Sequence, residues 1–151
     1  MLGFGWCHLQ TSRDVYNTTS IEDVEQVDAL VDKADSEMFE AFRMWMEQQH
    51  DPWFIWNLND HLNNHHGLLT FCLSRNHRSS IVWEVLDWIS KNAVGSYGLF
   101  YCHDDEDYMG RVRGERVTEG DFQNVYRVHK ILNGEVTEHS DRYFGDPDSK
   151  S

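Results

Sequence analysis

The sequence predicts an α+β fold: a two-layer sandwich of two main helices on a mainly antiparallel β-sheet, in the order β-α-β-β-α-β-β-β. Two long segments repeat apolar residues at spacings of three and four, the period of a helix face. Short aromatic and β-branched segments surround them. Asn133-Gly134 separates two alternating segments, and this dipeptide favours a tight antiparallel hairpin. A length of 151 residues matches one domain, which we expect over residues 1–144, followed by a polar tail over 145–151.

The N-terminal third is expected to hold one strand and the longer helix. Phe4 to Leu9 is aromatic and apolar-rich, which predicts a strand. Thr19 and Glu22 have the spacing of a capping box, which satisfies the free backbone donors where a helix begins. We expect this helix to run to about Gln49, with a break near Asp35-Ser36.

The remainder is expected to add a shorter helix and five strands. Ser79 or Ser80 caps the second helix, whose buried face is formed by Val82, Val85, Leu86, Ile89 and Ala93. The strands are expected over Trp53 to Asn59, Leu68 to Leu73, Tyr97 to Cys102, Phe122 to Leu132 and Glu135 to His139. Hairpins make these strands antiparallel, with some ferredoxin-like character, while their order within the sheet stays open.

The composition points to a folded, acidic protein. The chain has 26 Asp and Glu residues against 13 Lys and Arg residues, a formal net charge of −13. Such a surface repels phosphates, so we expect neither direct nucleic-acid binding nor binding to anionic membranes. Disorder is excluded by 6 Trp, 6 Tyr and 8 Phe residues. Opposite charges attract over distance, so a basic protein is the expected kind of partner.

We expect a cytoplasmic protein with reduced cysteines. The first residues have no basic region and no long apolar core, the two marks of a secretory signal. No apolar run approaches the length of a membrane span. Cys7, Cys72 and Cys102 are odd in number and widely spaced, which argues against both a disulfide framework and a zinc ribbon.

Two acidic groups are candidate partner-binding residues. Glu25, Asp28, Asp32 and Asp35 follow one another at spacings of three, four and three, which places them on one side of the first helix, and we expect that side to lie opposite the apolar stripe. The second group is the run Asp104, Asp105, Glu106 and Asp107, directly after a predicted strand. Carboxylates pair well with Arg and Lys of a partner. The alternatives are a solvated helix face for the first group, and a plain charged turn or a divalent cation site for the second.

The histidines offer a different hypothesis, a metal-binding module or metal-dependent hydrolase. It would use His61, His65, His66, His103 and Asp104. The histidines fall in predicted loops without paired cysteines, so we expect no metal and no cofactor. No nucleophile elbow, phosphate loop, zinc-protease helix or dinucleotide fingerprint is present, so an enzyme is not predicted.

Four segments follow one another along the chain: Gly5-Trp6, Leu73 to Arg78, the stretch from Val94 to Asp107, and the hairpin around Asn133-Gly134. Together they resemble the Immunity protein 7 family of bacterial polymorphic toxin and contact-dependent inhibition systems. In that family they are similar to the opening strand, the strand exit before the second helix, a hallmark stretch and the closing hairpin. The resemblance runs from Gly5 to about Asp141. The first helix and the segment from Tyr108 to Gly120 look longer than the family pattern, which is where specificity for one toxin would reside.

The resemblance implies a cytoplasmic antitoxin that binds the toxin domain of an effector and carries no catalytic residues. A nuclease, whose substrate groove must be basic, would fit the charge of this chain. Exposed aromatic residues would anchor such a partner. Trp45, Trp53 and Trp56 are candidates, with a place in the core as the alternative for each. An acidic adaptor for some other basic protein shares the same electrostatics and differs only in its partner.

Overall fold

The computed structural model describes residues 1–11, 24–60, 67–74, 79–103 and 126–141, and the statements below refer to these ranges. The elements are β1 (Leu2–Leu9), α2 (Val24–Glu47), β2 (Phe54–Asn59), β3 (Gly67–Ser74), α3 (Ile81–Asn92), β4 (Tyr97–His103), β5 (Tyr126–Leu132) and β6 (Glu135–Ser140). The predicted α+β class and element order are therefore confirmed. The proposed capping box at Thr19 and Glu22 lies outside the described residues.

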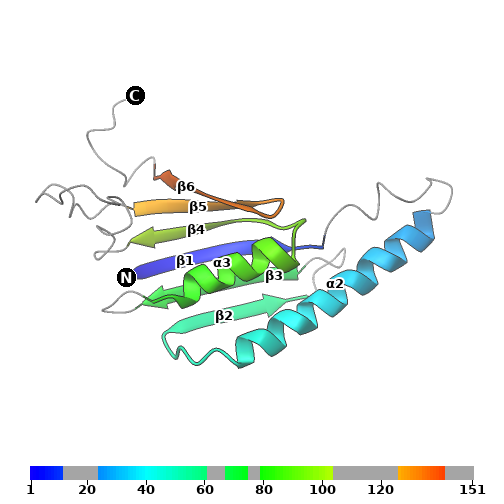
Figure 1. Ribbon diagram of the computed structural model, residues 1–151, viewed down its shortest axis with the longest axis horizontal. Coiled ribbons are helices and arrows are strands. Elements are labelled where there is room, and N and C mark those ends of the chain that lie inside the picture. Colours follow the sequence, from blue (N-terminus) through cyan, green and yellow to red (C-terminus); the bar gives the residue numbers. More distant parts are fainter. Residues whose placement is uncertain (12–23, 61–66, 75–78, 104–125, 142–151) are drawn as a thin grey trace, which may run out of the picture.

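The six strands form one antiparallel sheet in the order β2-β3-β1-β4-β5-β6. β1 is central: its first residue, Leu2, pairs with Ser74 on one side and with His103 on the other. The first four strands and the two helices have the ferredoxin-like β-α-β-β-α-β arrangement, and β5 and β6 extend the sheet beyond β4. Figure 1 shows both helices on the same face of the sheet.

α2 is continuous, so the expected break near Asp35-Ser36 is wrong. The hydroxyl of Ser36 donates a hydrogen bond to the backbone oxygen of Asp32 at 2.8 Å, which accommodates a serine inside a helix. The helix buries Val27, Met38, Phe39, Phe42 and Met46. Its N-terminal part extends past the ends of the strands (Figure 1), so the sheet supports only its later turns.

α3 begins after Ser79 and Ser80, and the capping hydrogen bond comes from Ser79 and not from the N-cap residue. Ser80 occupies the N-cap position, but its side chain makes no capping hydrogen bond. The Ser79 hydroxyl instead accepts a bond from the backbone N–H of Ile81 at 3.4 Å and donates one to Asp51 at 2.7 Å. The buried side of the helix is Ile81, Val82, Val85, Leu86 and Ile89, as the apolar spacing predicts.

The core lies between the helices and the sheet and is rich in aromatic rings. Phe71 and Phe100 stack at 5.4 Å on the sheet, and Phe42 of α2 meets Trp88 of α3 at 5.1 Å. Cys7 is fully buried among these side chains, and burial raises the pKa of its thiol to about 12.

The β5–β6 hairpin confirms the prediction from Asn133-Gly134. Both residues have positive φ, 49° and 78°, which a type I′ turn requires. Across the described ranges, neither helix is long and apolar enough to cross a membrane.

Candidate functional site

The acidic residues of α2 do not share one environment. Glu25 and Asp28 are exposed and Asp32 is half-buried. Asp35 is only 5% exposed, and its carboxylate accepts hydrogen bonds from the backbone N–H and the hydroxyl of Thr11, both at 2.7 Å. Thr11 follows the end of β1, so this carboxylate joins α2 to the sheet and is occupied within the chain.

The expectation that the acidic residues lie opposite the apolar stripe is also wrong. Asp35 is followed by Met38 and Phe42 at spacings of three and four, so it belongs to the buried stripe of α2. Asp28 and Asp32 continue the same stripe toward the N-terminus. Asp28 is exposed and Asp32 is half-buried, and this part of the helix extends past the ends of the strands (Figure 1). Glu25, Asp28 and Asp32 therefore form a short acidic projection at one end of the molecule, which we call the α2 acidic tip.

The later turns of α2 carry mixed charges. Lys33 lies 3.8 Å from Glu37, and Arg43 lies 3.0 Å from Glu40 and 2.8 Å from Asp60. Hydrogen bonding to Asp60 raises the pKa of Arg43 above its usual value. In the later part of α2, Glu37 and Glu40 are thus each paired with a basic residue of the same helix.

The second acidic group, Asp104 to Asp107, lies outside the described residues, as do His61, His65, His66 and His77. His103 ends β4, and its ring lies 5.0 Å from that of Tyr126. In the part of the chain that the structure describes, no group of three or more His, Cys, Asp or Glu residues is placed to hold a metal ion.

The face of the sheet opposite the helices carries large apolar side chains. Along β1 the alternation places Leu2, Phe4, Trp6 and His8 on this face, with Leu2, Phe4 and Trp6 exposed. β4 contributes Tyr97, Leu99, Tyr101 and His103. We call this surface the open face, because no element within the described ranges covers it.

Rings on the open face stack across the two central strands. Phe4 stacks on Tyr101 with centroids 5.1 Å apart, and His8 stacks on Tyr97 at 5.0 Å. Trp6 meets Tyr97 edge-on at 6.3 Å. These contacts hold the rings in fixed orientations, which lowers the conformational entropy that a binding partner would have to remove.

The register extends this surface across the sheet. One row joins Ile55, Cys72, Phe4, Tyr101 and Val128 through successive strand pairs. None of the open-face positions of β2, β3, β1 and β4 carries Asp, Glu, Lys or Arg. This is unusual in a chain with 26% charged residues, and depletion of charge is typical of the centre of a protein interface.

Of the three aromatic anchors considered from the sequence, two belong to the core and one is exposed. Trp45 and Trp56 pack against the core, where both rings meet Phe42. Trp53 is exposed, next to β2. The composition of Phe4 to Leu9 predicts a strand but does not show that one side of it is exposed. The alternation of large residues with Gly3, Gly5 and Cys7 is the sequence signal for the open face.

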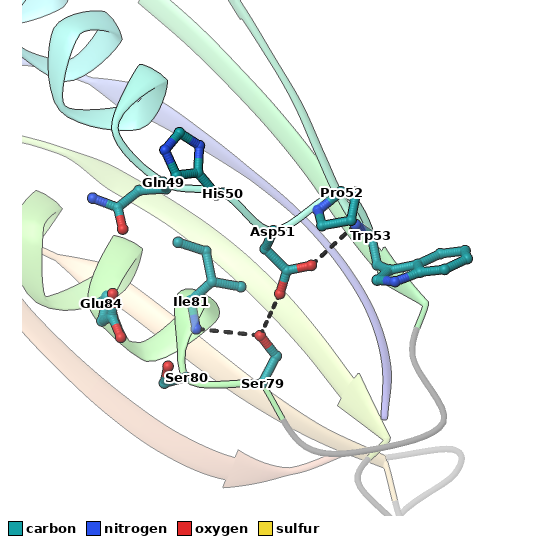
Figure 2. A pocket seen from close by; sticks show the side chains of 9 residues that line it. All are labelled: Gln49, His50, Asp51, Pro52, Trp53, Ser79, Ser80, Ile81 and Glu84. Atoms are coloured by element: carbon teal, nitrogen blue, oxygen red, sulfur yellow. Dashed lines mark hydrogen bonds between the residues drawn. The ribbon is translucent and has the colours of Figure 1, made fainter.

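A polar groove of about 560 Å³ lies where the end of α2 meets the start of α3 (Figure 2). Its central group is Asp51, whose carboxylate accepts hydrogen bonds from the Ser79 hydroxyl at 2.7 Å and from the backbone N–H of Trp53 at 3.0 Å. The Trp53 ring points away from the groove (Figure 2). Asp51 thus ties the turn before β2 to the start of α3, and we assign the groove a structural role.

Comparison with known proteins adds one finding. The family model described as Immunity protein 7 matches residues 56–147, more than half of the chain. The match begins in β2 and leaves out β1 and α2. No curated protein and no solved structure matches the chain significantly.

Proposed function

The chain belongs to the Immunity protein 7 family, and on this premise we propose that it neutralises one toxin domain with a basic surface, using its acidic groups to attract it. The family implies an immunity protein that acts against a toxin, and it points to an inhibitor that works by binding. A nuclease is the class of toxin that fits best, because a groove that holds nucleic acid must be basic. We place this action in the cytoplasm of the producing cell.

The observation that carries the proposal is the net charge of −13, together with the grouping of acidic residues in two segments of the chain. The α2 acidic tip projects beyond the sheet, and Asp104 to Asp107 follow β4 directly in the chain. Asp35 has no place in this surface, because Thr11 occupies its carboxylate. Attraction between opposite fields raises the rate of encounter more than it slows release.

The test is the association rate of the chain with the toxin domain encoded by the gene immediately upstream, measured against ionic strength. Neutralising the α2 acidic tip (Glu25→Gln, Asp28→Asn, Asp32→Asn) should slow association at low salt roughly tenfold and flatten its salt dependence, as expected when steering is lost. The dissociation rate should change little.

The matched control removes three charges from the later turns of the same helix (Glu37→Gln, Glu40→Gln, Glu47→Gln). Its net charge equals that of the tip variant, so any difference between the two reports position alone. Equal rates for both variants, or a native rate that does not respond to salt, would remove the steering claim. Absence of any binding by the native chain would remove the proposed function, and would favour an adaptor for another basic protein.

A further inference from the structure

We propose that the open face of the sheet is the surface on which the toxin domain docks, with Phe4, Trp6 and Ile55 as anchors. The inference rests on the proposed function and deepens it: the acidic groups bring the toxin close, and the open face holds it. The docking region of the toxin would be apolar at its centre and basic at its rim.

The first argument is the inverted arrangement of β1. A central strand normally turns its large apolar residues toward the covered face and its small or polar residues toward solvent. The first half of β1 does the reverse: Gly3 and Gly5 face the helices, while Phe4 and Trp6 face outward. Its second half follows the usual pattern, with Cys7 and Leu9 buried in the core.

The glycines are required by the core. A Cβ atom on Gly3 would lie 2.6 Å from the Phe100 ring, and one on Gly5 would lie 2.7 Å from the Phe71 ring. These neighbouring phenylalanines fill the space on the covered face. Packing of the core therefore explains the glycines. It does not explain the exposed rings, which contribute little to the core and need another purpose.

The second argument is the character and size of the face. Aromatic residues at the centre of a surface poor in charge are the composition of an interface hot spot. On the open face, Lys130 and Glu135 lie toward one edge, on β5 and β6. The four uncharged strands, β2, β3, β1 and β4, have 6 to 8 residues each. Spaced about 4.8 Å apart with about 3.3 Å per residue, they give a face of roughly 450 Å² in projection. A standard interface buries about 800 Å² on each partner, so these strands supply its centre and the surrounding rim supplies the rest.

The third argument selects the occupant. Two copies of the chain would each carry a net charge of −13, and this like charge opposes their association. A basic domain carries the opposite charge and would be attracted. The α2 acidic tip lies toward the Leu9 end of β1, because Thr11, just beyond Leu9, bonds Asp35 of α2. A cationic partner seated on the open face would have this negative charge at one end.

The experiment compares two double variants that leave the net charge unchanged. Phe4→Thr with Ile55→Thr removes apolar groups that are 55% and 66% exposed on the open face. Leu30→Gln with Met44→Gln removes groups that are 54% and 59% exposed on α2. Binding to the upstream-encoded toxin domain is measured by calorimetry. The open-face variant should bind at least about 30-fold more weakly, as for a hot-spot truncation, and the helix variant within about threefold of the native chain.

Native-like affinity of the open-face variant, while the native chain binds toxin, would overturn the inference and leave the proposed function intact. If the native chain dimerises in sedimentation and the dimer is abolished by Phe4→Thr and Ile55→Thr, the face belongs to a second copy, and this also overturns the inference.

Should the open-face variant fail to fold, the reactivity of Cys72 in the native chain decides. A thiol that is blocked in the chain alone means that the chain covers its own open face, which contradicts docking there. A thiol that reacts alone and is protected by the toxin supports it.

Discussion

His129 places an ionisable ring in the core beneath α3. It is 3% exposed, stacks on Phe100 at 5.9 Å and meets Trp83 edge-on at 4.8 Å. Its Nε2 atom lies 3.7 Å from Glu138 and has no hydrogen-bond partner in the described structure. Burial lowers the pKa of His129 below its usual value; Glu138 opposes this effect, and the positive charges of Arg127 and His139 add to it.

The lowered pKa predicts acid sensitivity. As the pH falls through about 6.5, the ring takes up a proton in the unfolded chain before it does so in the folded protein, so the free energy of unfolding decreases. His129→Phe should reduce this decrease between about pH 7 and pH 5, measured by urea unfolding at each pH. His50→Phe, at an exposed position after α2 that does not contribute to the pKa of His129, is the control and should keep the native pH dependence. An unchanged slope in His129→Phe would show that other groups cause the sensitivity.

At the scale of elements, α2 is held to the sheet at three places. The later turns pack Phe42 and Met46 into the core. Arg43 pairs with Asp60 just beyond β2. Asp35 accepts the two hydrogen bonds from Thr11 just beyond β1. The projecting α2 acidic tip begins N-terminal to the Asp35–Thr11 contact, so Asp35 supports the tip and does not belong to it.

Removing the Asp35–Thr11 contact should cost stability. Asp35→Ala leaves the Thr11 N–H without its acceptor, and hydrogen bonds to charged groups contribute about 1.5–3 kcal/mol, so we expect a loss of that size in the free energy of unfolding. Glu25→Ala, which removes an exposed carboxylate from the same helix, should change it by less than about 0.5 kcal/mol. Denaturant unfolding measures both. If the Asp35→Ala protein is as stable as the native chain but associates slowly with the toxin, Asp35 is a partner-binding residue and not a structural contact.

The elements could be predicted where their signals are local. The apolar spacing of α3 and the Asn133-Gly134 turn each depend on residues close in the chain, and both were correct. The burial of Asp35 could not be predicted in this way, because its partner Thr11 lies 24 residues away. The side of the sheet that Phe4 faces depends on Phe71 and Phe100, which fill the other side from distant strands.

At the scale of the molecule, the acidic residues of the α2 acidic tip and the apolar residues of the open face occupy different surfaces. The family implies a toxin as the partner. The charge of −13 suits attraction of a basic domain, and the aromatic centre of the open face, uncharged on β2, β3, β1 and β4, suits its retention. Composition alone predicted the first property. The second required the order of the strands, since β1 becomes central only when β3 and β4 pair on either side of it.

The most direct test of docking on the open face is the reactivity of Cys72, measured by maleimide labelling and mass spectrometry without any substitution. Cys72 is exposed on the open face between Ile55 and Phe4, whereas Cys7 and Cys102 are buried and serve as internal controls. In the chain alone, Cys72 should react and the other two should not. Saturation with the toxin domain should slow its labelling at least about tenfold, because a covered thiol is reached only when the complex opens. Equal reactivity of Cys72 in the free chain and in the stoichiometric complex would contradict the account.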